Sequence, residues 1–136
     1  MILYFGIGEK YMKYYDEFVN WLNKHLSKDI PTNILAINFN LYESSEQTYD
    51  IQMTGSDEFD EKDEDWACNT VFSTDEDLFV ISRTDDISEW WQGLIFISAL
   101  VQKYLESGMY AEKLKSYKAV GIGFVDGDID ILYRSN

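Results

Sequence analysis

Hydrophobic side chains recur every three or four positions in the first part of the chain. This spacing predicts an amphipathic helix from Glu9 to about Ser27, with Pro31 just beyond its end. The side chains on its apolar stripe are Tyr11, Tyr15, Phe18, Leu22 and Leu26. Because such a stripe is buried in a folded domain, this helix is expected to pack against a sheet.

The pattern then changes to an alternation of hydrophobic and polar residues, which is typical of half-buried strands. Residues 35–42 and 49–54 alternate in this way around a short polar segment, so they predict a hairpin. Residues 66–72 and 78–81 predict two further strands, joined by a polar turn.

A second helix is predicted from Ile87 to about Ser107. Asp86 is a suitable N-cap, and Glu89 follows three residues later in a capping-box arrangement. Hydrophobic side chains lie on nearly every side of this helix, so it is expected to be the central and most buried one. The residues expected to pack on the sheet are Leu94, Ile97, Leu100 and Val101. A short helix is predicted after it, over residues 109–116.

The chain ends with a predicted hairpin of residues 119–124 and 129–133. Asp126-Gly127 lies between the two runs and favours a tight turn in which glycine takes a positive φ. The face formed by Ala119, Gly121 and Gly123 is nearly flat and would let a helix approach closely. The order of elements predicts one α+β domain over residues 1–136. Its mostly antiparallel sheet of about five to six strands packs against one central apolar helix and the N-terminal amphipathic helix.

Composition supports a folded domain in a reducing compartment. The chain has 136 residues, of which 46% are hydrophobic and 16% aromatic, whereas disordered acidic chains are poor in aromatic residues. Its single cysteine, Cys68, rules out an internal disulfide. Residues 1–5 have no basic segment of the kind that opens a signal peptide, so a soluble, cytoplasmic protein is expected.

The net charge is confined to the middle of the sequence. Residues 41–90 contain sixteen acidic residues against Lys62 and Arg83, and so account for the whole formal charge of −14. Charge concentrated in this way makes a directional field that steers a basic partner. Nucleic acids and anionic membranes are not expected as direct partners, because binding to phosphate depends on Lys and Arg.

The densest acidic segment is the candidate partner-binding site. It holds seven acidic residues in the nine positions 57–65, with Phe59 among them and Trp66 beside them. Aromatic anchors surrounded by charged residues are typical of protein interfaces. The candidate residues are Asp57, Glu58, Phe59, Asp60, Glu61, Asp63, Glu64, Asp65 and Trp66. The alternative is a solvated loop that only keeps the protein soluble.

No catalytic residue, metal ligand or cofactor site is assigned from the sequence. Counted from Asp57, an EF-hand loop would need Gly and Glu where Lys62 and Cys68 stand. Asp128 and Asp130 alternate with isoleucines, as on the solvated face of a strand. The single histidine, His25, and the single cysteine show no nucleophile-and-base arrangement, and His25 is expected to interact with solvent at a helix end.

The second half of the chain resembles the small acidic α+β immunity proteins that bacteria encode beside polymorphic or contact-dependent toxins. The segments that suggest it are Asp65-Trp66-Ala67-Cys68, Val71-Phe72, the tryptophan-bearing helix, and residues 121–128. The resemblance implies an inhibitor without cofactor or catalytic residues, whose partner is a basic toxin domain. A nucleic-acid mimic is a near alternative. An enzyme that uses paired carboxylates or a divalent metal is the alternative from another class.

Overall fold

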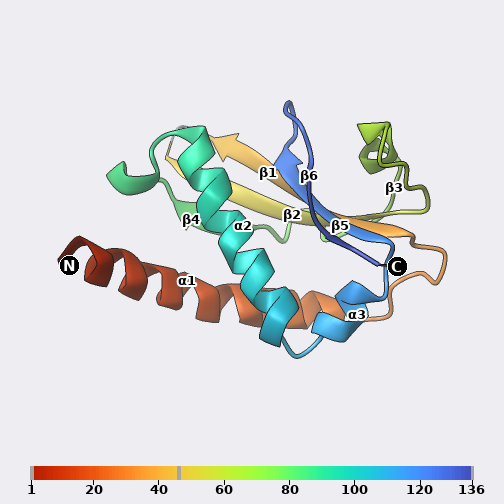
Figure 1. Ribbon diagram of the computed structural model, residues 1–136, viewed down its shortest axis with the longest axis horizontal. Helices are drawn as coiled ribbons and strands as arrows, with labels where there is room; N and C mark the ends of the chain where they lie inside the picture. Colours follow the sequence, from red (N-terminus) through yellow and green to blue (C-terminus); the bar gives the residue numbers. More distant parts are fainter. Residues whose placement is uncertain (1, 46, 136) are drawn as a thin grey trace.

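Two long helices pack on one face of a mixed sheet, and a short 3₁₀ helix covers part of the other face (Figure 1). The structure is a computed structural model that describes residues 2–45 and 47–135, with side chains from residue 8 onward. The elements in chain order are α1 (Ile2–Leu26), β1 (Ala36–Ser44), β2 (Thr48–Ser56), η1 (Glu64–Cys68), β3 (Thr70–Ser73), β4 (Phe79–Ser82), η2 (Asp85–Ile87), α2 (Trp90–Ser107), α3 (Ala111–Lys115), β5 (Ala119–Phe124) and β6 (Asp130–Arg134). The predicted α+β class, with a mostly antiparallel sheet and two packed helices, is confirmed.

The strand order within the described residues is β3-β2-β1-β5-β6, and β4 also pairs with β2. All pairs are antiparallel except β1 with β5, which run parallel. Both predicted hairpins, β1–β2 and β5–β6, are therefore confirmed. The parallel pair was not predicted, and it places Phe39 of β1 between Met53 of β2 and Ile122 of β5. Hydrophobic residues from three strands thus line up across the helix-covered face.

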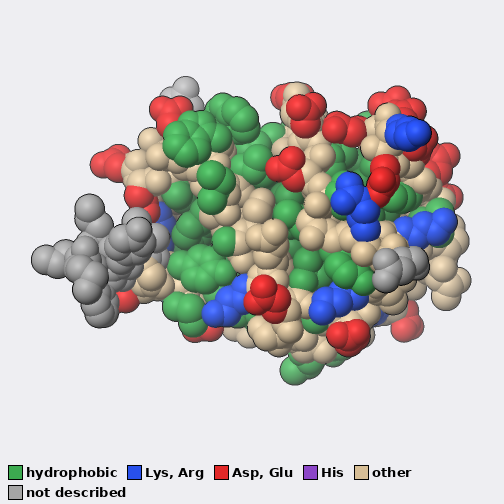
Figure 2. Space-filling model, in the orientation of Figure 1, with side chains coloured by type: hydrophobic (Ala, Val, Ile, Leu, Met, Phe, Trp, Pro, Cys, Tyr) green, Lys and Arg blue, Asp and Glu red, His purple; other side chains and the backbone are tan. Residues whose placement is uncertain are grey.

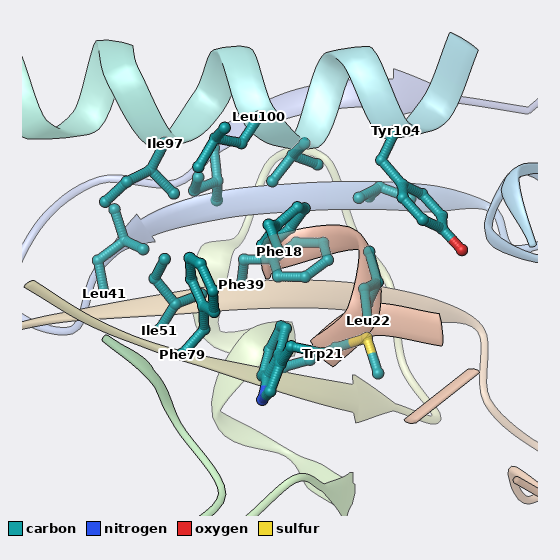
Figure 3. Close-up of a cluster of buried hydrophobic side chains, with 14 of the residues drawn as sticks. Phe18, Trp21, Leu22, Phe39, Leu41, Ile51, Phe79, Ile97, Leu100 and Tyr104 are labelled. Carbon is teal, nitrogen blue, oxygen red and sulfur yellow. The ribbon is translucent and has the colours of Figure 1, made fainter. Parts of the chain in front are cut away.

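The main core lies between the helices and the sheet (Figure 3). Phe18 of α1 is fully buried, and its ring centroid lies 6.2 Å from that of Phe39 and 6.5 Å from that of Tyr104 of α2. Most of the predicted stripe of α1 is buried, and Tyr11 at its start is half-buried. Of the four α2 residues expected on the sheet, three are fully buried and Leu94 is half-buried.

The long helices begin at different residues from those predicted. The backbone of α1 is helical from Ile2, before the expected start. Helix α2 begins at Trp90, and its capping box consists of Glu89 and Gln92 rather than Asp86 and Glu89. Asp86 does not cap α2 because it lies in η2, a separate 3₁₀ turn before the helix. Its carboxylate forms an ion pair with Lys10 at 2.9 Å.

The segment predicted as a strand over residues 66–72 is a strand only at its end. Asp63 caps η1 by accepting a hydrogen bond from the backbone N–H of Asp65 at 3.1 Å, so the chain coils before β3 begins. A local cap has therefore overridden the alternation of side chains.

The β5–β6 turn also differs from the prediction. Gly127 donates its N–H to the Phe124 carbonyl at 2.9 Å, and no described glycine has a positive φ, so the tight primed turn does not form. The flat glycine face turns away from the long helices. A Cβ at Gly121 would lie 2.8 Å from Cγ2 of Ile129 and 3.5 Å from the Trp66 ring, so the return segment and η1 use this space.

Candidate functional site

The acidic segment 57–65, here called the acidic loop, consists of the connection after β2 and the first two residues of η1, and most of its side chains are exposed. Several of its carboxylates already interact with other residues of the chain. Asp57 accepts a hydrogen bond from the Asn69 amide, and Asp60 accepts one from the Lys62 backbone N–H at 2.9 Å. Glu61 forms an ion pair with Arg134 of β6. Glu58 and Asp65 carry charges for which the described residues provide no ion pair.

Trp66 is a packing residue, which corrects its prediction as a partner-binding anchor. Its side chain is 3% exposed and packs on Ala36 and Ala119. Ser56 donates its hydroxyl to the Trp66 carbonyl at 2.7 Å. The indole fills the space that these small residues leave on the sheet. Phe59 is half-buried, with its ring edge-on to Trp66 and the centroids 5.3 Å apart.

Glu64 connects the acidic loop to the β5–β6 loop. Both of its carboxylate oxygens lie 3.3 Å from the backbone nitrogen of Ile129, which donates the hydrogen bond. The carboxylates of Asp126 and Asp128 are therefore brought next to the acidic loop, although they are remote from it in sequence. Figure 2 shows acidic side chains along the upper rim of the molecule, over both loops. The two acidic regions thus lie along the same rim, and we call their acidic side chains together the acidic surface.

On the far side of the β5–β6 loop lies an aromatic hollow of about 660 Å³. Its apolar lining comes from Trp90, Leu94 and Phe124. The rings of Trp90 and Phe124 are edge-on, with their centroids 6.2 Å apart. The carboxylates at its rim are Glu43, Asp126, Asp128 and Asp130. We call this feature the acidic-aromatic hollow.

The first turns of α2 expose apolar side chains beside this hollow. Trp90 is 53% exposed, Trp91 49% and Ile95 64%. Apolar surface gathered in this way, with charged residues around it, is typical of an interface with another protein. Figure 2 shows hydrophobic side chains gathered over the start of α2.

The sequence prediction did not find this hollow. It placed the tryptophans in a buried helix and treated Asp128 and Asp130 as a solvated strand face. One signal was available: Trp91 and Ile95 lie on the side of a helix opposite Ile97 and Leu100, so these four residues cannot all face one core. Trp90 shares the face of Ile97 and is exposed because it is the first residue of α2.

A second, polar cleft of about 420 Å³ lies on the sheet face opposite the long helices. Side-chain amides form a ladder along it: Asn38 donates to Asn40 at 2.6 Å, and Asn40 donates to Gln52 at 3.3 Å. Gln52 also accepts the Tyr42 hydroxyl at 3.1 Å. Glu64 and Asp65 line one side of this cleft, so it borders the acidic loop. The ladder rigidifies the sheet face beneath the loop.

His25 and Cys68 lie apart, on opposite faces of the sheet. His25 is buried at the end of α1, where its Nε2 lies 2.7 Å from the Asp77 carboxylate; this corrects the expectation that it meets solvent. Burial lowers the pKa of His25, and the bond to Asp77 offsets part of that shift. Cys68 is exposed in η1. In the described part of the chain, no three His, Cys, Asp or Glu side chains are grouped to hold a metal ion.

Comparisons with protein-family models, with curated proteins and with solved structures find no match for this chain. None of the helices in the described residues is long and apolar enough to cross a membrane.

Proposed function

We propose that this protein acts by binding, and that it neutralises a basic protein partner through its acidic surface. The observation that carries the proposal is the meeting of two acidic loops beside exposed aromatic side chains. Glu64 holds the 57–65 loop against the β5–β6 loop, and Trp90 and Trp91 lie exposed beyond it. Carboxylates at the rim steer encounter, and desolvated aromatic side chains stabilise the complex.

The charge of the chain supports a basic protein as the class of partner. A formal charge of −14 attracts a surface rich in Lys and Arg over distances of about a Debye length, roughly 8 Å at physiological salt. The resemblance to bacterial immunity proteins supports a toxin domain as this partner, with the acidic surface covering its basic substrate-binding face. In such an inhibitor the rim charges set the association rate, and the aromatic contacts set the lifetime of the complex.

The test uses the product of the gene next to the one that encodes this chain. We expect that product to be a basic protein that stops growth when expressed alone, and to be neutralised when this chain is co-expressed. The purified proteins should form a complex whose association rate falls as salt is added. A neighbouring product that forms no complex would refute the proposal.

A second measurement separates binding from the enzyme alternative. Calorimetric titration with Ca²⁺, Mg²⁺ and Mn²⁺ should give no tight, stoichiometric uptake. Stoichiometric uptake of one of these ions would favour a carboxylate-metal site and an enzymatic role instead.

A further inference from the structure

We propose that the acidic-aromatic hollow receives an arginine side chain of the basic partner. This inference rests on the proposed function and adds to it the place of contact and the side chain that is recognised. The hollow has two parts that suit arginine. Trp90 and Phe124 offer aromatic surface, and the rim offers carboxylates.

The aromatic part suits a guanidinium group and its methylene stem. Trp90 is 53% exposed, and tryptophan is the best ring for a cation placed over its face. Leu94 and Phe124 are half-buried beside it and can cover the apolar stem of a long side chain. The hollow therefore offers contact along the whole of an arginine side chain.

The rim supplies charge that the protein leaves uncompensated. Asp126, Asp128 and Asp130 are exposed and have no ion pair with any described residue, whereas Glu43 pairs with Arg83 at 2.9 Å. A cation entering the hollow would therefore meet three free carboxylates. Charge complementarity thus favours a basic side chain over an apolar or acidic one.

The protein already shows the same chemistry at the edge of this hollow. The Arg83 guanidinium carbon lies 4.8 Å from the Tyr49 ring centroid while Arg83 pairs with Glu43. The Tyr49 ring in turn lies 6.0 Å from that of Phe124. One arginine of the chain is thus held between a ring and a carboxylate, and Trp90 with the aspartates repeats this arrangement toward solvent.

Arginine fits better than lysine for a geometric reason. Its planar guanidinium stacks on a ring and also bonds a carboxylate with two parallel N–H donors. A lysine ammonium is a compact, strongly hydrated charge that gains less from stacking. The hollow is therefore expected to bind an arginine peptide more tightly than a lysine peptide of equal charge.

The experiment uses blocked peptides of alternating glycine and arginine, or glycine and lysine, as probes. Binding to the full chain is followed by NMR of the tryptophan indole N–H groups and quantified from titrations. The arginine peptide should shift the Trp90 signal in a saturable way and bind more tightly than the lysine peptide. Trp90→Ala should weaken the arginine peptide about tenfold. Trp91→Ala is the matched control, because Trp91 is equally exposed on α2 but does not line the hollow.

Two triple variants, each of which removes three negative charges, provide a second comparison. Asp126→Asn with Asp128→Asn and Asp130→Asn changes the hollow, whereas Asp60→Asn with Glu61→Gln and Asp63→Asn changes the acidic loop, none of whose residues lines the hollow. The first should weaken binding of the arginine peptide more than the second. Equal losses of affinity in the two triple variants, together with equal effects of Trp90→Ala and Trp91→Ala, would contradict arginine binding in the hollow. The neighbouring-gene test of the proposed function would not be affected by this result. Shifts confined to the Asn40 and Gln52 amides would also contradict binding in the hollow, by moving the site to the polar cleft.

Discussion

The Glu64 carboxylate accepts a hydrogen bond from the backbone N–H of Ile129, and this bond joins two acidic loops that are far apart in the sequence. The charge pattern drew attention only to the loop that contains Glu64. Ile129 belongs to a segment of balanced charge, yet the aspartates around it face the same solvent. The acidic surface is therefore larger than the segment that carries the net charge.

Neutralising the acidic loop should slow association without unfolding the protein. The variant combines Asp60→Asn, Glu61→Gln and Asp63→Asn. Rim charges act mainly on the on-rate, so association at low salt should slow and its salt dependence should flatten. Stability should change little, because an asparagine side chain in place of Asp63 can still cap η1. Stopped-flow association with the cognate partner across a salt series is the measurement, and unchanged on-rates at low salt would reduce the loop to a solubilising role.

Trp66→Ala should act on stability. The indole is 3% exposed and fills the space above Ala36 and Ala119, so its loss should cost about 3–5 kcal/mol of unfolding free energy. Trp91→Ala removes an exposed indole and should change stability by less than about 0.5 kcal/mol. Urea denaturation of both variants is the measurement. Equal stabilities would place Trp66 at the surface after all.

Leu100→Ala tests the packing of α2 on the sheet. Leu100 is fully buried, so the variant should lose about 2–5 kcal/mol. Ile95→Ala on the same helix is the control: Ile95 is 64% exposed, and its loss should be close to neutral. An unchanged denaturation midpoint for Leu100→Ala would contradict the burial of this face.

Two glycine substitutions should have opposite outcomes. A Cβ at Gly93 would lie 2.5 Å from Cζ of Tyr49, whose hydroxyl is held by the Ile87 carbonyl at 2.6 Å, so the ring cannot easily retreat. Gly93→Ala should therefore destabilise by about 1–3 kcal/mol despite the higher helix propensity of alanine. Gly127→Ala should be tolerated, because its nearest neighbour would be 3.7 Å away and its φ is not positive. Thermal unfolding of both variants is the measurement. Strong destabilisation by Gly127→Ala would indicate that Gly127 has a positive φ, as in the primed turn.

Acid should weaken the contact between α1 and the segment before β4. The hydrogen bond from Lys24 lowers the pKa of the Asp77 carboxyl most, and that from His25 adds to it. The stability from Asp77 is therefore present above its unfolded-state pKa and is lost as pH falls through the lower folded-state value. Burial holds the pKa of His25 below its ordinary 6.5, so the unfolded chain takes up this proton first as pH falls.

The two groups can be separated by variants. Unfolding free energies would be measured between about pH 7 and pH 3 for wild type, Asp77→Asn and His25→Gln. The stability of wild type relative to His25→Gln should decrease as pH falls below about 6.5, and relative to Asp77→Asn below about 4. Differences that stay constant with pH would contradict these shifts.

Local patterns predicted those parts of the fold that local interactions determine. The stripe of α1 and the alternation in β1 and β2 were sufficient because each repeats over several residues. The pairing of β1 with β5 was not predictable in this way, since nothing near Ala36 in sequence indicates Ala119. Trp66 was misplaced for a related reason: the space that it fills exists only after these two strands meet.

The candidate site was predicted in part. The acidic loop follows from composition alone, and the structure leaves most of its side chains exposed. The hollow depends on where the start of α2 lies relative to the β5–β6 loop, which no periodicity encodes. Sequence identified one source of charge, whereas the fold adds the aromatic surface beside it.

The parallel pairing of β1 with β5 also has a consequence for synthesis on the ribosome. Strand β1 can pair with β2 as soon as both have emerged, but its other edge stays open until residues 119–124 are made. The nascent chain therefore passes through a stage in which an apolar strand edge is unprotected, a state prone to aggregation. Closing this edge requires a contact of long sequence separation, which makes it a slow step. The acidic loop, made before that closure, would keep such half-made chains apart by mutual repulsion.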